Sequence, residues 1–304
     1  MGAPESVASG AATGTAGYAD AAATDDDALF VLTAALLTPA QFPSVLGDDY
    51  PAACAALHLE AWAGGYGLVL GQDGTGARWT VVVDDVSLVA VAIASWDCGM
   101  AYDLSPDERS VVCALPGWPL AVATAAPGLP APHDPAPEEG APAPLTPPDG
   151  TTWGPAQRRM GADMVALQWA EWRARLGGPA EGGAGEADNG MGDGNGNGQD
   201  GEVGSGDGAE DEASGPYGTV RRALRELSAY VEEAPPVGRV RSSFAAGEAR
   251  MLRADGPGWS LVARTDDMAF VLLDEAPNEV LPVARGPRLP ALLKALDAMA
   301  VRPS

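Results

Sequence analysis

Residues 259–271 read WSLVARTDDMAFV, and residues 79–89 read WTVVVDDVSLV. In both stretches a tryptophan and a hydroxyl residue precede two apolar residues, and an Asp-Asp pair separates them from a second run of strand-forming residues. Such runs on either side of a polar turn, without helical spacing, predict a β-hairpin. The two copies predict two related halves in which Trp79 and Trp259 occupy equivalent, largely buried positions.

This repeat predicts an α+β fold of two pseudo-repeated halves, each with antiparallel sheet and packed helices. Two segments, rich in small or acidic residues, lack the apolar side chains that would offset the entropy of ordering them. The predicted organisation is a disordered tail at 1–27, an N-terminal α+β half at 28–126, a Pro-rich linker at 127–152, a helix at 153–176, a disordered acidic Gly-rich linker at 177–215 and a C-terminal α+β half at 216–304.

Helix signals open the N-terminal half. Asp25–Asp27 place negative charge before the apolar run Leu29–Leu37, which predicts a helix that ends at Pro39. A second helix is predicted from Pro51 to the glycines at 64 and 65. The strands predicted after it are Gly67–Leu70, Trp79–Val83, Val86–Ala94, Gly99–Asp103 and Ser110–Leu115.

The C-terminal half repeats this order of elements. A narrow apolar seam predicts a helix over Val220–Val231, and a last helix starts at Pro290. The strands predicted between them are Arg239–Phe244, Ala249–Ala254, Trp259–Arg264, Met268–Leu273 and Glu279–Val283.

Charge is distributed unevenly along the chain. The net charge is −24, and residues 1–27 and 177–215 supply 15 of those negative charges because they hold five and ten acids and no base. Binding to nucleic acid is disfavoured, since it requires Lys and Arg clustered on one face. The chain has 18 basic residues, of which only Lys294 is a lysine, a usage typical of GC-rich genomes such as those of actinobacteria.

The composition also indicates a compartment. Three cysteines without C-x-x-C spacing fit buried thiols in a reducing cytoplasm better than a disulfide framework. The N-terminus lacks the basic and apolar regions of a signal peptide, and no apolar run is long enough for a membrane span. We therefore expect a cytoplasmic protein.

Motifs that carry chemistry are scarce. The two histidines, His58 and His133, are too few for a histidine-rich metal site, and the Asp-Asp pairs fit hairpin turns better than a calcium loop. No phosphate-binding, nucleophile-elbow or zinc-protease motif occurs. We expect no catalytic residues, no metal site and no cofactor, which favours a binding protein.

Tryptophan is the remaining candidate for a functional side chain. The chain has eight tryptophans against four phenylalanines. Trp96, between Ser95 and Asp97, and Trp118, between Gly117 and Pro119, are predicted at strand ends and loops. Because exposed tryptophan is enriched at binding hot spots, we take Trp96 and Trp118 as candidate partner-binding residues, although burial in a core is the commoner fate.

Several short motifs carry a family resemblance. They are FPSVL at 42–46, the Ala-rich helix ending in Ala-Trp at 55–62, YGL at 66–68, SSF at 242–244 and the closing helix at 290–299. Together with the order of elements, they resemble the EspG-type chaperones of actinobacterial type VII (ESX) secretion. The resemblance covers about a third of the chain. It implies a cytosolic chaperone for the helical tip of a secreted PE–PPE-like or WXG100-like substrate, and it identifies no individual binding residue.

Three functional hypotheses follow. The first is a non-enzymatic cytosolic protein-binding module, such as a chaperone or adaptor for type VII secretion substrates. The second is a small-ligand-binding protein or enzyme with a pocket between the halves, using carboxylates such as Asp97 and Asp103. The third is an immunity-type or regulatory protein. A pocket of convergent carboxylates would favour an enzyme, and an exposed apolar groove would favour a binder.

Overall fold

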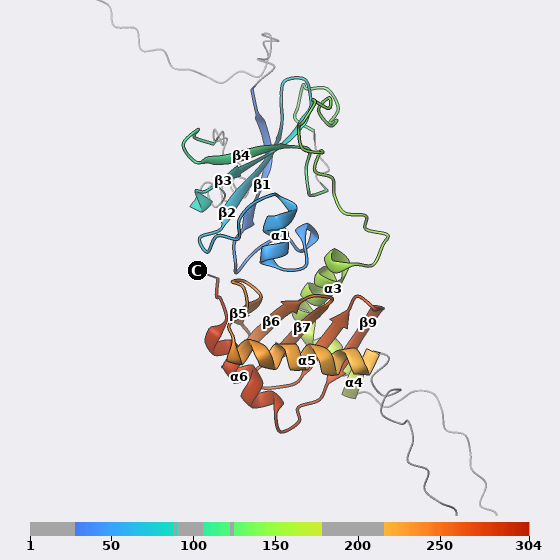
Figure 1. Cartoon of the computed structure of the whole chain (residues 1–304). Coiled ribbons are helices and arrows are strands. Elements are labelled where there is room, and N and C mark those ends of the chain that lie inside the picture. Colours follow the sequence, from blue (N-terminus) through green and yellow to red (C-terminus); the bar gives the residue numbers. More distant parts are fainter. Residues whose placement is uncertain (1–27, 88, 90–105, 122–124, 178–215, 304) are drawn as a thin grey trace, which may run out of the picture.

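The computed structural model describes residues 28–87, 89, 106–121, 125–177 and 216–303 (Figure 1). Within these ranges it contains antiparallel sheets of four and five strands and five α-helices, so the fold is α+β, as predicted. The sheets belong to two lobes, with α1 and α3 at the boundary between them (Figure 1). The disordered segments predicted at 1–27 and 177–215 lie outside the described residues, except Gly177 at the end of a helix.

The N-terminal lobe is an antiparallel meander with a short helix on one face. Asp49 caps helix α1 (Tyr50–Ala56) by accepting a hydrogen bond from the Ala52 backbone N–H at 2.9 Å. Cys54 and Leu57 pack against Leu68 of the sheet. The elements around α1 are β1 (Phe30–Leu37), the 3-10 turn η1 (Ser44–Leu46), β2 (Tyr66–Gln72), β3 (Arg78–Val83) and β4 (Val111–Pro116).

The helix predicted over residues 29–37 is wrong, because this segment is strand β1. Its backbone pairs with β2 from Phe30–Gln72 to Leu37–Tyr66. An isolated helix of this length is marginal in water, whereas the strand gains a ladder of hydrogen bonds and buries Leu32 and Leu37. Tertiary pairing therefore overrides the local helix signal.

The first copy of the predicted hairpin is also wrong. After β3, Asp85 accepts hydrogen bonds from the backbone N–H and hydroxyl of Ser87, at 2.9 and 2.6 Å, and Val86 and Ser87 are helical. This Asx-type cap turns the chain into helix instead of a second strand. The strand predicted at 99–103 and the rest of 86–94 lie largely outside the described residues.

Residues 127–152, predicted as an extended Pro-rich linker, follow the surface of the N-terminal lobe. The His133 backbone carbonyl accepts a hydrogen bond from Arg78 N–H at 2.8 Å, and Asp134 pairs with the Arg78 guanidinium. Further along, Leu145 N–H donates to Pro116 O at 2.7 Å. These contacts lead the chain to the second lobe.

The C-terminal lobe has three layers. Its central antiparallel sheet runs in chain order, and α5 with α6 covers one face while α3 with α4 covers the other (Figure 1). Alternate residues explain this, since Leu261 packs toward α5 and α6 and Val262 packs toward α3 and α4. The elements are α3 (Pro155–Leu167), α4 (Trp169–Gly177), α5 (Pro216–Glu232), β5 (Val240–Phe244), β6 (Arg250–Gly256), β7 (Trp259–Arg264), β8 (Ala269–Leu273), β9 (Ala276–Val283) and α6 (Leu289–Met299).

The second predicted hairpin exists as β7 and β8. Trp259 pairs with Leu273 and its ring is buried, whereas Trp79 on β3 is only partly buried. Trp79 is the second residue of β3 and Trp259 the first residue of β7, and each of these is the third strand of its own antiparallel meander. The repeat thus corresponds to a shared strand position, without the shared hairpin that it predicted.

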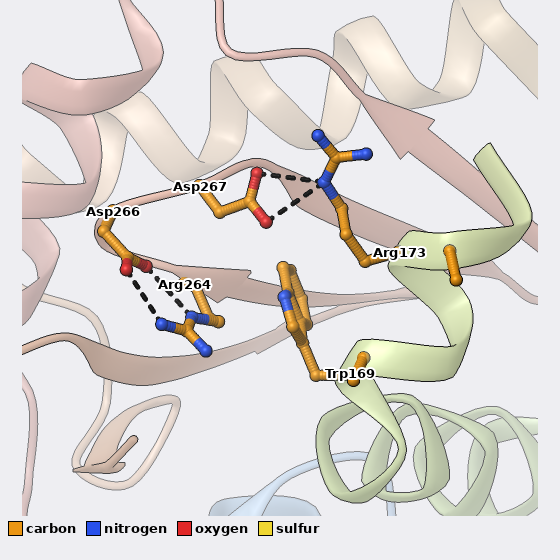
Figure 2. Close-up of a pocket in the computed structure, with 7 residues that line it drawn as sticks. Trp169, Arg173, Arg264, Asp266 and Asp267 are labelled. Carbon is orange, nitrogen blue, oxygen red and sulfur yellow. Dashed lines mark hydrogen bonds and ion pairs between the residues drawn. The ribbon is translucent and has the colours of Figure 1, made fainter. Parts of the chain in front are cut away.

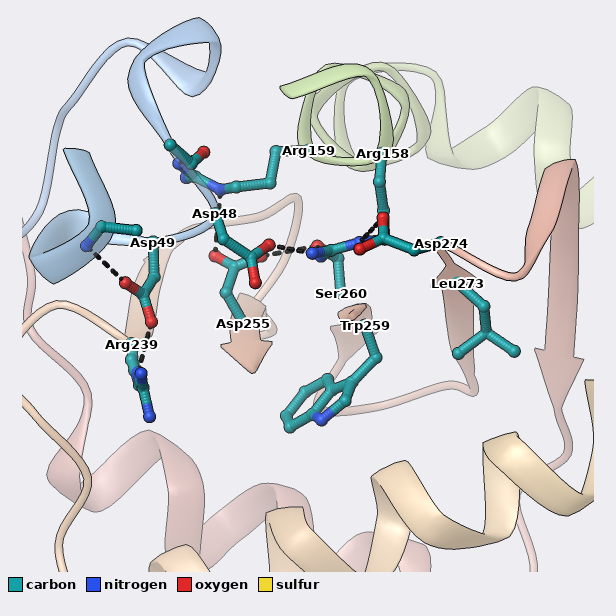
Figure 3. A network of polar contacts seen from close by, with 12 residues as sticks. Asp48, Asp49, Arg158, Arg159, Arg239, Asp255, Trp259, Ser260, Leu273 and Asp274 are labelled. Atoms are coloured by element: carbon teal, nitrogen blue, oxygen red, sulfur yellow. Dashed lines mark hydrogen bonds and ion pairs between the residues drawn. The ribbon is translucent and has the colours of Figure 1, made fainter. Parts of the chain in front are cut away.

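A buried ionic network joins the two lobes (Figure 3). Arg158 of α3 pairs with Asp48 of the N-terminal lobe, bonds Asp274 at 2.8 Å and donates to the Ser260 hydroxyl at 2.5 Å. Ser260 in turn donates to Asp255 at 2.7 Å. Because Arg158 is fully buried, its charge depends on these partners.

Asp255 is the second centre of this network. Its carboxylate is enclosed by Arg159, at 3.5 Å, and Arg241, at 3.0 Å. Both guanidinium groups also lie over the Phe42 ring of the N-terminal lobe, at 4.0 and 4.6 Å from its centroid. Burial lowers the pKa of Arg159 to about 10. At the edge of the network, Asp49 pairs with Arg239 while it caps α1.

Candidate functional site

The structure places Trp118 in the core, so the prediction that its ring is exposed for a partner is wrong. Its side chain is 2 % exposed and packs with Leu32 and Leu70. Its indole N–H donates to Gly71 O at 2.9 Å. Gly117, with φ of +83°, turns the chain back onto the sheet and directs the ring inward. Trp96, Asp97 and Asp103 lie outside the described residues.

A groove beside α4 in the C-terminal lobe is the candidate site, and Figure 2 shows the part of it next to the β7–β8 turn. It consists of two adjoining hollows of about 750 and 520 Å³ that share Trp169, Ala170 and Arg264. Helix α4 forms one wall, and the β7–β8 turn and the end of β5 form the other. We call it the α4 groove.

Trp169 anchors the α4 groove. The helical region predicted at 153–176 breaks at Gln168, whose ψ of 33° ends α3, and α4 starts at Trp169. The Trp169 ring meets Phe270 of the sheet edge-on, with centroids 5.1 Å apart. The tryptophan is buried, so a rigid apolar surface separates the helix from the sheet below it.

Paired charges line one side of the groove. Arg264 donates two hydrogen bonds to Asp266, at 2.9 and 2.8 Å, and Arg173 Nε contacts both carboxylate oxygens of Asp267, at 3.2 and 3.1 Å (Figure 2). The hydrogen bond from Arg264 lowers the pKa of Asp266. Both carboxylates are therefore engaged as ion-pair acceptors, and neither is placed to act as a general base.

Apolar side chains line the other side. Leu167, the last residue of α3, is 81 % exposed, and Phe244, the last residue of β5, is 90 % exposed. Met164 lies one turn before Leu167 and is also exposed. Arg250 stacks over the Phe244 ring at 4.5 Å. Leu167 and Phe244 are therefore two large apolar side chains that face solvent beside the same groove.

Sequence reasoning missed these residues. Phe244 has the same strand parity as the buried Val240 and Ser242, and it is exposed because β5 ends there. Leu167 lies inside the single helix predicted at 153–176, whereas α3 ends at that residue. One usable signal was the width of the apolar arc over residues 160–176, which exceeds what one packing surface can cover.

Other chemical groups in the described chain are poor candidates for catalysis. Burial raises the pKa of the Cys54 and Cys113 thiols, which disfavours reactive thiolates. Over the described ranges, no group of three or more His, Cys, Asp or Glu side chains is arranged to hold a metal ion. His58 is exposed and its φ is +58°, at the end of α1.

Comparisons with known proteins add no relative to this picture. No protein-family model matches the chain, and no match was found among curated proteins or among solved structures. In addition, none of the described helices combines the length and the apolar character needed to cross a membrane.

Proposed function

We propose that this chain is a protein-binding module that captures an amphipathic helical segment of a partner protein in the α4 groove. The observation that carries the proposal is the exposure of Leu167 and Phe244 beside a groove anchored by Trp169. Apolar grooves of this kind receive the apolar face of a helix through residues spaced at i, i+3, i+4 and i+7.

The charge of Arg173 indicates a second feature of the partner segment. Arg173 is half exposed and uses its Nε for Asp267, while its two terminal nitrogens point away from that carboxylate (Figure 2). These nitrogens can donate charge-assisted hydrogen bonds to a carboxylate of the partner. The segment that fits best carries apolar side chains on one face and an acidic residue beside them.

The resemblance to EspG-type chaperones supports a more specific proposal. The captured segment is the helical tip of a secreted substrate of type VII secretion, held in the cytoplasm before export. The groove offers the exposed apolar surface that such a role requires, and its carboxylates are occupied by arginines. We therefore favour capture over catalysis.

A comparative capture experiment tests the proposal. Wild-type protein and the Leu167→Asp/Phe244→Asp variant are used as baits in lysate of the native host, with Tyr217→Asp as control. Tyr217 is a matched exposed aromatic residue on α5, across the sheet. We expect one protein with a helical segment to be retained by wild type and control and lost by the groove variant.

Two outcomes would contradict the proposal. If all three baits retain the same proteins, the groove is not the binding surface. If the groove variant changes only the mass of the purified protein in solution, measured by light scattering, the groove joins two copies of this chain. Circular dichroism confirms that each bait is folded.

A further inference from the structure

A second cavity lies on the opposite face of the C-terminal sheet from the α4 groove. It has a volume of about 440 Å³, is open to solvent on one side and is lined by α5, the loop after β9 and the start of α6. Leu224, Val283, Leu289 and Leu292 give it an aliphatic surface. The size falls within the range of small-molecule sites, roughly 300–1,000 Å³. We call it the α5–α6 pocket.

Two arginines give this pocket a positive rim. Arg225 of α5 and Arg288 at the start of α6 both line it, and none of the acidic residues that the structure describes does. Within the part of the chain that the structure describes, neither guanidinium makes an ion pair or a hydrogen bond. Residues 216–304 hold twelve basic and eleven acidic residues, so charge in this half nearly balances, and the two arginines give the cavity a local excess of positive charge.

The N-terminal end of α6 adds to the positive charge at the rim of the pocket. No side chain caps the first turn of α6, and Arg288 and Leu289, which open that helix, line the pocket. The partial positive charge of a helix N-terminus therefore acts in the same direction as the two guanidinium groups. An anionic head group at this rim would meet arginine donors, and an attached chain would leave water for the aliphatic surface.

We propose that the α5–α6 pocket binds a medium-chain aliphatic carboxylate. A carboxylate matches the planar fork of arginine, and none of the described lining residues has an aromatic ring on which a nucleotide base would stack. Positive charge at the rim excludes a cationic ligand. The inference does not rest on the protein-binding proposal, because a different surface of the lobe carries it.

Calorimetric titration with a chain-length series tests the site. Decanoate, kept below its micelle concentration, is expected to bind with a stoichiometry of one. Each methylene that enters the pocket contributes about fourfold in affinity, so octanoate should bind roughly 15-fold more weakly than decanoate. Neutral decanol should bind at least about tenfold more weakly, because it lacks the carboxylate that accepts charge-assisted hydrogen bonds from the two arginines.

Surface variants separate the site from general adsorption. Arg225→Gln/Arg288→Gln should weaken decanoate binding about tenfold or more while leaving decanol binding unchanged. Ser228→Leu, which fills the pocket from an exposed position on its wall, should weaken both ligands. The control is Arg109→Gln, an exposed arginine of the N-terminal lobe, which should bind as wild type does.

Three results would overturn the proposal. They are absence of heat at about millimolar decanoate, equal affinity for decanoate and decanol, and equal decanoate affinity in the Arg225→Gln/Arg288→Gln variant and wild type. Binding at several sites that Ser228→Leu leaves unchanged would show detergent-like adsorption, which also contradicts it.

Discussion

At the scale of single residues, the structure depends on buried charges that are fixed by geometry. Asp255 is fully buried and accepts hydrogen bonds from Ser260 and Arg241, with Arg159 close by. Replacing buried ion pairs by apolar groups is often harmless, but removing one partner leaves an uncompensated charge. The two kinds of ion pair in this chain, buried at the junction and exposed at the groove, therefore predict different mutational costs.

Asp255→Asn should lower the free energy of unfolding by about 3–5 kcal/mol, because it leaves Arg159 and Arg241 buried without their anion. Urea denaturation measures this change. The control is Asp266→Asn, whose pair with Arg264 is exposed and should be worth at most about 1 kcal/mol. Equal costs for the two substitutions would contradict the network shown in Figure 3.

The same carboxylate predicts the direction of pH dependence. Burial alone would raise the pKa of Asp255, but Arg159, Arg241 and Arg253 hold it well below its ordinary value. A carboxyl group with a lowered native pKa stabilises the fold above its unfolded pKa of about 3.9, and that contribution is lost as pH falls toward the native pKa. Urea denaturation at pH values from about 7 to 3 should show stability falling below about pH 4, and less steeply in Asp255→Asn.

At the scale of elements, close packing in the second sheet is the main constraint. Gly256 ends β6 and pairs with Trp259, and a Cβ at residue 256 would collide with the indole ring. The ring cannot yield easily, because it is buried and its N–H donates to Glu226 at 2.5 Å. Glycine is required at this position by space.

Gly256→Ala should therefore destabilise the protein by about 1–3 kcal/mol through overpacking. Gly286→Ala is the matched control, because a Cβ at residue 286 meets nothing within 4 Å, and it should be neutral or slightly stabilising. Thermal unfolding followed by circular dichroism compares the two. A neutral Gly256→Ala variant would show that Trp259 does not fill this position.

Strand and helix identity was predictable where local pattern and tertiary pairing agree. The β7–β8 hairpin follows from two strand-forming runs on either side of a polar turn, and α5 follows from a narrow apolar seam. The sequence did not predict strand β1, because its pairing with β2 is a long-range contact, and the local charge and apolar pattern favoured a helix. The sequence also could not predict the α4 groove, because Leu167, Phe244 and Arg264 come from three separate elements that only the tertiary fold brings together.

At the scale of the whole molecule, two lobes meet through a junction of buried charges and the Phe42 ring. The N-terminal lobe contributes Asp48 and Asp49, and the C-terminal lobe contributes Arg158 and Arg239. Because Arg158 is fully buried, separation of the lobes would leave it without one carboxylate partner. The junction therefore couples the stability of the two lobes.

This coupling predicts the shape of a calorimetric scan. Wild-type protein should unfold in one transition, and Asp48→Asn/Asp49→Asn should separate it into two, with the N-terminal lobe melting first. Asp84→Asn, an exposed substitution in the N-terminal lobe, is the control and should keep the single transition. A single, unshifted transition in the junction variant would show that these pairs do not couple the lobes.

The central claim is that the α4 groove holds a helical segment of a partner protein. Its most direct test is a calorimetric titration of the captured partner's helical segment into wild-type protein and into folded Leu167→Asp. Removal of a central hot-spot contact typically costs about 2 kcal/mol or more, so we predict a dissociation constant at least roughly thirtyfold higher for Leu167→Asp, with Tyr217→Asp equal to wild type. Equal affinity for all three proteins would contradict the claim.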